Sequence, residues 1–393
     1  MYEICKKGVR SVKKLYINAN IYNSDKKKFI FGSLLADGET ISEVFWGEGQ
    51  PSVDFDEMND LGGAYLIPGL IDVHTHGRVG GDFNSADADT MVKMARSYLE
   101  KGVTGVMPTL ASDTLDGLYS SIEKISDVKK QGGKNFLGVH LEGRYLNPAK
   151  RGAHAATLLA SPNAMEIENL VKAMKKAGAA HVSAALELDT DGKFTETAIG
   201  EGATVGLAHT NANYAEAKTA IERGARSLTH LFNTMPPLHH RDGGAVAAGL
   251  TDKEVFCEII ADGFHIAPEM VKLAYMMKKD KLVLITDSME ATGMPDGEYS
   301  IAGLPVTVKD GKARTHEGAI AGSTLELIYG VRNLARFAEI SFAEAIYNAT
   351  AAPAKMIGVY NRIGSIEKGK TADMLVLDGE YNAMEVIFRG EKI

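Results

Sequence analysis

The sequence predicts an α/β fold in which a (β/α)8 TIM-like barrel carries a small β-sandwich domain built from both chain termini. Three observations lead to this prediction. Short apolar segments alternate with helical patterns between residues 68 and 358, which is typical of a barrel. The stretches before and after this region contain only short strand-like segments and turns. Several histidines and carboxylates stand where the central apolar segments end.

Length and composition are those of a globular protein with a large core: 393 residues, 45% hydrophobic and 24% charged. The net charge of −8, without a dense Lys/Arg patch, argues against a nucleic-acid surface. No apolar run approaches the ~18 residues of a membrane span, and no apolar region follows the basic start, so we expect neither a membrane partner nor a signal peptide. Cys5 and Cys257 form no disulfide framework, which favours a reducing compartment and a cytoplasmic location.

The two ends of the chain have the same texture. Residues 1–66 and 359–393 are expected to form the small β-domain together, with residues 67–358 inserted between them as a catalytic barrel. The strand-like segments of the ends are 15–17, 29–35, 374–378 and 383–388.

The central region contains eight candidate strands, namely 70–74, 104–110, 135–142, 180–188, 203–209, 227–232, 256–262 and 282–287. Helical patterns separate most of them, at 88–101, 113–129, 163–177, 213–223, 267–279, 323–338 and 342–357. The connections after the fourth and sixth strands look too short or irregular for long helices. A closed barrel is favoured over a doubly wound sheet, because no G-x-G-x-x-G follows a strand. Residues 294–320 interrupt the alternation and are expected to form a β-hairpin.

The first candidate strand ends in a histidine pair. Ile67–Gly77 reads IPGLIDVHTHG, with a Pro-Gly entry, a short apolar strand, and then His74 and His76. Alternate residues of a strand face the same side, so the two imidazoles point one way. Imidazole is a common metal ligand, so the pair is a candidate metal site. The alternative is that His74 and His76 are a surface pair without a ligand.

Other polar residues stand at the ends of later strands: His140 and Glu142 on the third, His209 on the fifth, His230 on the sixth, Asp262 and His265 at the seventh, and Asp287 on the eighth. The strands of a parallel barrel run the same way, so these residues should gather at one rim, where barrel enzymes keep their chemistry. Instead of binding a metal, His209 and His230 could be buried core histidines. Glu142 could instead be an ion-pair partner. His140 could be a neighbour of a metal ligand or a hydrogen-bond donor to one, and both possibilities stay open. His181 and His316 are assigned no role.

Neutral imidazoles and carboxylates suit Zn²⁺ or Fe²⁺, and the absence of cysteine ligands argues against a closed structural zinc site. A catalytic metal lowers the pKa of its bound water from ~15.7 to ~7. Asp287, on the last strand, is a candidate proton acceptor, with helix capping as the alternative.

Two loops offer anion contacts. Thr229–Gly244 contains Asn233, His239, His240 and Arg241, and a guanidinium forms fork-like hydrogen bonds with phosphate. A solvated basic loop is the alternative. The stretch GAIAGST, residues 318–324, can present backbone N–H groups at a helix start with Ser323 as N-cap.

The chain resembles the N-acetylglucosamine-6-phosphate deacetylases, a branch of the amidohydrolase superfamily, from about residue 67 to 324 and again in GSIEKGKTADMLVLD. The matching stretches are PGLIDVHTHG, HLEGRYLNPAKRGAH, AHTNANYAEA, THLFNTMPPLHHRDGG, IADGFHI, LITDSMEATGMPDGEY and GAIAGST. HLEG with His154 twelve residues after its Glu, together with THLFN and the downstream Arg, is specific to this branch. Arg144 stands where the family usually has Pro, and Thr234 where it commonly has Ala; these departures bear on which sugar is bound.

The resemblance implies metal-dependent hydrolysis of the acetamide of N-acetyl-D-glucosamine 6-phosphate, in amino-sugar catabolism or cell-wall recycling. Glu142, His209 and His230 would hold the main metal, and His74 and His76 a second, so one or two Zn or Fe ions are expected per chain. Asp287 would be the base and then the acid, and His154 would polarise the acetamide carbonyl. The implied substrate-binding residues are Ala153, Asn233, Thr234, Arg241, His265, Ile320, Ala321 and Gly322.

The resemblance also implies a homodimer in which Arg241 reaches a neighbouring subunit's site. The nearest alternative is the same reaction on N-acetylgalactosamine 6-phosphate. A non-catalytic sugar-phosphate sensor and a dihydroorotase-like cyclic amidase are more distant alternatives.

Overall fold

The computed structural model describes residues 11–393, so Cys5 lies outside the described part of the chain. The chain divides into two compact units. One ends at Gly69 and resumes at Asn361, and the other is Leu70–Tyr360.

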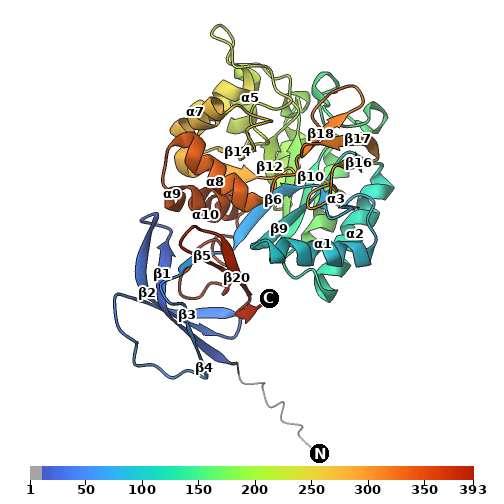
Figure 1. The fold of residues 1–393 in the computed structure, drawn as a ribbon. Coiled ribbons are helices and arrows are strands. Elements are labelled where there is room, and N and C mark those ends of the chain that lie inside the picture. Colours follow the sequence, from blue (N-terminus) through green and yellow to red (C-terminus); the bar gives the residue numbers. More distant parts are fainter. Residues whose placement is uncertain (1–10) are drawn as a thin grey trace, which may run out of the picture. The chain divides into compact units, whose positions relative to one another are not determined.

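Both ends of the chain contribute strands to one sheet in the first unit (Figure 1). Its strands are β1 (Lys13–Asn23), β2 (Lys28–Asp37), β3 (Thr40–Trp46), β4 (Glu57–Asp60), β5 (Tyr65–Pro68), β19 (Met374–Leu377), β20 (Ala383–Phe388) and β21 (Glu391–Lys392). The order is β21-β20-β19-β5-β1-β2-β3, with β4 also paired to β1. Because β19 pairs antiparallel with β5, the prediction that both termini build one β-domain is confirmed. The strands that were predicted to form a β-sandwich are all hydrogen-bonded into one sheet.

The second unit contains the predicted barrel. Its parallel strands are β6 (Leu70–Thr75), β9 (Val103–Leu110), β10 (Gly138–Glu142), β11 (Ala179–Ala184), β12 (Thr204–Leu207), β13 (Ser227–Leu228), β14 (Phe256–Ile260) and β15 (Leu282–Ile285). They are hydrogen-bonded in sequence order from β6 to β15. The ring closes just past β15, where the Asp287 N–H donates to the His74 carbonyl at 2.9 Å. The strands before His209 and Asp287 end two residues earlier than predicted, and the strand before His230 ends four residues earlier.

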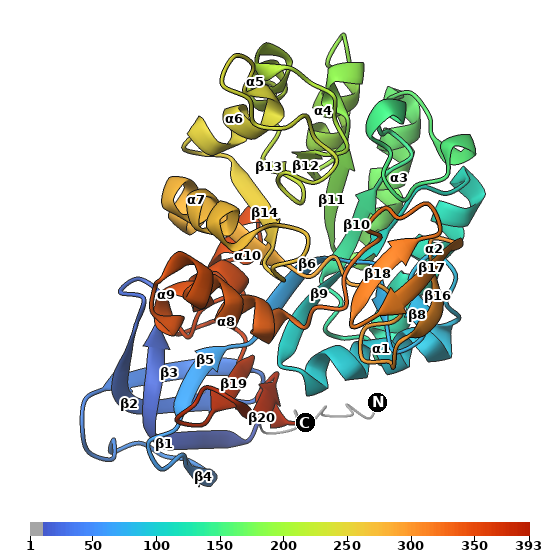
Figure 2. The ribbon, with the colours of Figure 1, turned by 45° about the horizontal axis from the view of Figure 1, so that its top comes forward.

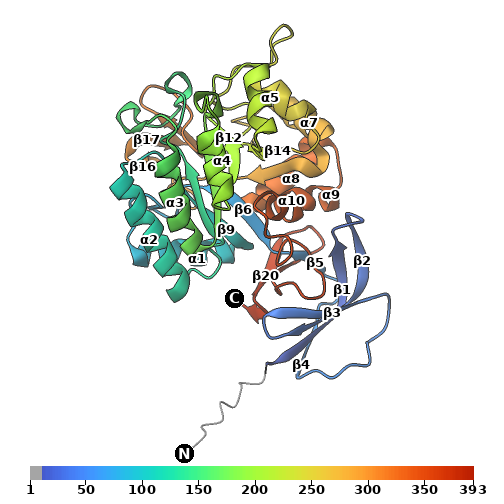
Figure 3. The same ribbon diagram turned by 180° about the vertical axis from the view of Figure 1, so that it is seen from behind.

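Helices lie outside these strands (Figures 1 and 3). They are α1 (Ala88–Glu100), α2 (Leu115–Gln131), α3 (Ala164–Ala177), α4 (Lys193–Gly200), α5 (Tyr214–Glu222), α6 (Gly244–Thr251), α7 (Pro268–Lys278), α8 (Leu327–Ala338), α9 (Phe342–Ile346) and α10 (Ala351–Met356). The fourth and sixth connections hold the short helices α4 and α6. The single helix predicted over 342–357 is wrong: Pro353 lacks an N–H and its ring would clash with the preceding turn, so α9 and α10 are separate.

The interruption after β15 is a three-stranded antiparallel sheet of β16 (Gly297–Ile301), β17 (Leu304–Lys309) and β18 (Lys312–Thr315), which extends the predicted hairpin by one strand (Figure 2). Its apolar side chains pack with Met289 and Ala321. A small ribbon of β7 (Gly77–Arg78) and β8 (Gly81–Asp82) follows β6. Ser323 is not an N-cap: its hydroxyl donates to the Thr286 carbonyl, and α8 begins four residues later, at Leu327.

Candidate active site

One group of candidate metal ligands consists of Glu142, His209 and His230. Glu142 ends β10, and the two histidines follow β12 and β13. The Glu142 Oε1 atom lies 2.9 Å from His230 Nε2 and 3.3 Å from His209 Nε2, and all three side chains are buried. Both histidines have positive φ angles, 44° and 31°. This backbone conformation is strained for residues with a side chain, and such strain concentrates at functional sites.

A second group consists of His74, His76 and Asp287. Asp287 Oδ1 lies 3.5 Å from His74 Nε2 and 3.3 Å from His76 Nε2. The other oxygen of Glu142, Oε2, lies 3.3 Å and 3.0 Å from the same two nitrogens. The Glu142 carboxylate therefore stands between the two groups and turns one oxygen toward each.

The donor atoms fit divalent cations. His209 Nδ1 lies 2.9 Å from the Lys150 carbonyl, which can only accept a hydrogen bond, so Nδ1 carries the proton and Nε2 keeps its lone pair. His74 Nε2 is buried and has no hydrogen-bond partner among the described residues. Imidazole nitrogens with carboxylate oxygens, and no cysteine, are a ligand set of catalytic zinc and of non-haem iron.

The electrostatics of the two ligand groups also favour cation binding. Burial disfavours the charged imidazole, but the Glu142 and Asp287 carboxylates outweigh it and raise the pKa of His74 well above its ordinary value. The same balance raises the pKa of His76 to about 9. Burial alone would raise the pKa of Asp287, yet the His74 and His76 rings lower it to about 2. The two carboxylates thus attract positive charge strongly, and a bound cation would take the place of the histidine protons.

His154 lies at the edge of this centre, with Nε2 3.8 Å from Glu142 Oε2. The Ser112 backbone N–H donates to His154 Nδ1 at 3.2 Å, and the Ser112 hydroxyl lies 2.9 Å from the same nitrogen. Burial, aided by the neighbouring His209 ring, lowers the pKa of His154 to about 3. The ring is therefore neutral at pH 7, with its proton on Nε2. Ser112 was not predicted, because an isolated serine after a strand carries no pattern.

A cavity of about 280 Å³ opens beside the ligand groups. Six of the predicted substrate-binding residues line this cavity: Ala153, Asn233, Thr234, His265, Ile320 and Gly322. Ala321 does not line it: this side chain is 1% exposed and packs in the apolar cluster under β16–β18. Arg241 does not line it either, because it stands exposed on the loop that follows His230.

Beneath the metal ligands, the barrel interior contains further polar residues. His140 Nε2 lies 2.8 Å from the Ser183 hydroxyl and its Nδ1 3.2 Å from Thr109 Oγ1, so His140 belongs to neither ligand group. Glu258 on β14 is fully buried, with Oε2 3.1 Å from His74 Nδ1. Glu258 was not predicted, although it is the lone charged residue of the apolar strand FCEII.

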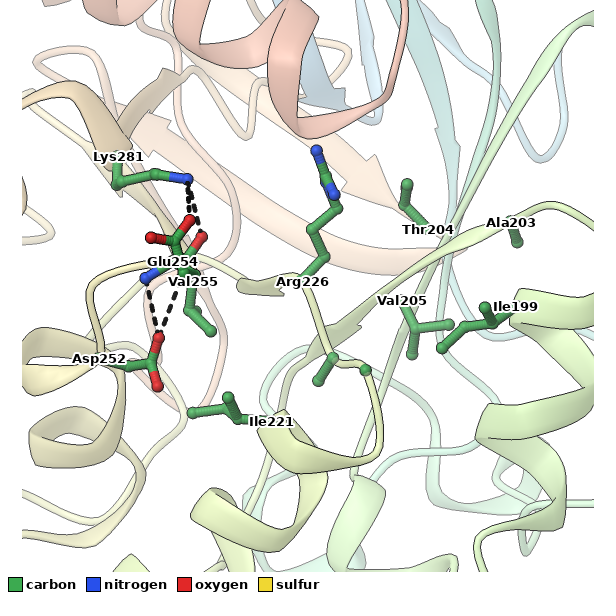
Figure 4. A pocket seen from close by; sticks show the side chains of 12 residues that line it. Ile199, Ala203, Thr204, Val205, Ile221, Arg226, Asp252, Glu254, Val255 and Lys281 are labelled. Atoms are coloured by element: carbon green, nitrogen blue, oxygen red, sulfur yellow. Dashed lines mark hydrogen bonds and ion pairs between the residues drawn. The ribbon is translucent and has the colours of Figure 1, made fainter.

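A larger cavity, of about 520 Å³, lies near the starts of β12, β13 and β14 (Figure 4). Its charged side chains are already paired. Lys281 Nζ lies 3.2 Å from Glu254 Oε2, and Arg226 donates to the carbonyls of Lys355 and Met356. This cavity contains no histidine and neither ligand group, so size alone does not identify the chemical site.

Across the described residues, the helices are all too short or too polar to cross a membrane. Residues 65–392 match the sequence model of the Amidohydrolase family. The chain is 35% identical over 332 residues to N-acetylgalactosamine-6-phosphate deacetylase of Escherichia coli O157:H7, covering 83% of this chain and 87% of that protein. It is 33% identical over 361 residues to N-acetylglucosamine-6-phosphate deacetylase of Vibrio furnissii, covering 90% and 88%. The crystal structure of N-acetylglucosamine-6-phosphate deacetylase from Pasteurella multocida superposes with a TM-score of 0.90 at 29% identity, covering 97% of this chain and 99% of that one.

Proposed function

The chain belongs to the amidohydrolase family, and we propose that it hydrolyses the acetamide of N-acetyl-D-glucosamine 6-phosphate to D-glucosamine 6-phosphate and acetate. The observation that carries this proposal is the Glu142 carboxylate shared between two histidine groups, beside a cavity that also contains Asp287 and His154. These groups can activate water and can stabilise the negative charge that develops on the carbonyl oxygen of an amide under attack.

The residues have distinct roles in this scheme. Glu142, His209 and His230 would hold a divalent metal, which would supply a polarised acetamide carbonyl and a water that is nucleophilic at neutral pH. Asp287, ionised at pH 7, accepts the proton of the attacking water and then passes it to the leaving amine. His154 donates its Nε2–H to the carbonyl oxygen as negative charge accumulates there.

We further propose that the metal is Zn or Fe, and that His74, His76 and Asp287 would hold a second ion on the side that Glu142 Oε2 faces. Asn233, Thr234 and His265 would hold the sugar phosphate. Arg241, exposed and outside its own cavity, would bind the phosphate of a neighbouring subunit in a cytoplasmic homodimer.

N-acetylgalactosamine 6-phosphate is the second candidate, because the E. coli relative carries that name. The deciding experiment measures acetate release from both epimers with protein whose metals have been counted. Preferential release from the gluco substrate supports the proposal, and preferential release from the galacto substrate replaces it. Binding without release of acetate from either would favour a sensor. Equal turnover of an amide without phosphate would favour a cyclic amidase.

A further inference from the structure

Glu258 is the one acidic residue inside the described barrel strand β14, and its side chain is completely buried. A buried carboxylate is costly unless hydrogen bonds or opposite charges compensate it. The Oε2 atom lies 3.1 Å from His74 Nδ1 and 3.4 Å from the backbone nitrogen of His230. The contact with His74 is made to the ring that would ligate a metal, whereas the contact with His230 is made only to its backbone.

The contact with His74 determines which ring nitrogen carries the proton. A carboxylate ion only accepts hydrogen bonds, so the His74 Nδ1 facing Glu258 carries the hydrogen. The other nitrogen, Nε2, then presents its lone pair toward Glu142 and Asp287, 3.3 Å and 3.5 Å away. A carboxylate behind a ligand histidine is a recurrent arrangement in metal proteins, because it fixes the ring and increases its basicity.

Among the described residues, the ionic contacts of Glu258 are with the rings of His74 and His181, and none is with a lysine or arginine. The His181 Nε2 atom lies 3.7 Å from Glu258 Oε1, beyond hydrogen-bond distance. Burial lowers the pKa of His181 to about 4, so this ring is neutral at pH 7. The placement of Glu258 is therefore explained by its contacts with the metal-ligand groups rather than by an internal ion pair.

We propose that Glu258 is a positioning residue that holds His74 in the orientation and tautomer required to ligate a metal at the group of His74, His76 and Asp287. This proposal rests on the proposed function, since it assumes that this group binds an ion. It assigns Glu258 no contact with substrate. Its effect should fall on the affinity of the second ion, and much less on that of the ion held by Glu142, His209 and His230.

The test is a titration of metal-free protein with Co²⁺, followed by visible absorption and by calorimetry, for wild type, Glu258→Ala and Glu258→Gln. Glu258→Ala should weaken the weaker of two sites by about 10- to 100-fold, as loss of a carboxylate behind a ligand typically does. Glu258→Gln should restore most of that affinity, because its amide oxygen can accept from His74 Nδ1. His181→Asn is the matched control: it alters a buried group beside the same carboxylate, and it should leave both affinities unchanged.

Equal weakening of both sites, or an unchanged second site in Glu258→Ala, would overturn the proposal. If the variants fail to fold, nitrogen-15 NMR of the histidines in the metal-loaded wild type decides, since His74 must appear as the Nδ1–H tautomer. An Nε2–H signal for His74 would refute it. Failure of the proposed function is seen separately, as absence of acetate release by wild type that binds two ions normally.

Discussion

Replacing Asp287 with Asn isolates proton transfer from metal binding. The Asp287 carboxylate is ionised at pH 7, because the His74 and His76 rings lower its pKa, so it can accept a proton. Asn has the same size, keeps one oxygen, and tolerates the left-handed backbone at this position, where φ is 49°. The substitution therefore removes the base while the local structure is preserved.

The expected magnitude follows from the role. A positioned general acid–base contributes about 10²- to 10⁴-fold to rate, which corresponds to about 3 to 5 kcal/mol of activation free energy. Asp287 is expected to serve in two proton transfers, so the loss in kcat should lie near the upper end. The KM should change little, because no hydrogen bond to the sugar phosphate is removed.

The assay is steady-state acetate release with metal content measured on the same sample. Asp287 Oδ1 lies 3.3 Å from His76 Nε2, so loss of the second ion must be separated from loss of the base. His76→Asn is the control, because it disturbs the same ligand group and leaves the carboxylate. If Asp287→Asn retains its metals and loses less than tenfold in kcat, the assignment of the proton relay is wrong.

Three other predictions address the phosphate, the protons of the site and the backbone beside His154. Arg241→Ala should raise KM for the phosphorylated sugar by about 10- to 100-fold, the loss of a charged hydrogen bond, and far less for unphosphorylated N-acetylglucosamine; equal effects in steady-state kinetics would exclude a phosphate contact. In metal-free protein, the pKa of His76 is raised from 6.5 to about 9. Protonated His76 therefore contributes on the order of 3 kcal/mol to the free energy of unfolding. This contribution is present below pH 6.5 and is lost as the pH rises through 9. The melting temperature should fall over that window only when metal is absent, and a parallel fall in the loaded protein would contradict this. Arg144→Pro should lower kcat and stability together, since φ is 41° at this position and its N–H donates to the Ser112 hydroxyl that contacts His154. Arg144→Ala keeps that N–H and serves as control; equal thermal stability and kcat in the two variants would refute the reasoning.

The sequence patterns predicted most of the barrel because its signals are local. Strand apolarity, the helical period and the polar residues at strand ends all lie within a few neighbouring positions. Strand ends were placed too late near His209, His230 and Asp287, because positive φ angles turn the chain there and cannot be read from residue type. Side-chain direction was equally hidden: Ala321 and Ile320 are adjacent, yet only Ile320 reaches the cavity.

The candidate ligands were recognisable because histidines are few and stand at comparable points of successive strands. The roles of the residues behind them were not recognisable. Ser112 and Glu258 acquire their meaning only through contacts with residues 42 and 184 positions away. Contacts at such separations leave no periodic trace in a single sequence.

The pairing of β5 with β19 has a consequence for synthesis of the protein. Pro68 meets Met374 across this ladder, so the partner of an early strand is translated about 300 residues later. At ribosomal rates of roughly 5 to 20 residues per second, β5 waits about 15 to 60 s with one edge unpaired. An unpaired strand edge is a template for aggregation. The nascent chain should therefore be most vulnerable during this interval, and slow translation or a truncated carboxyl terminus should reduce the yield of soluble protein.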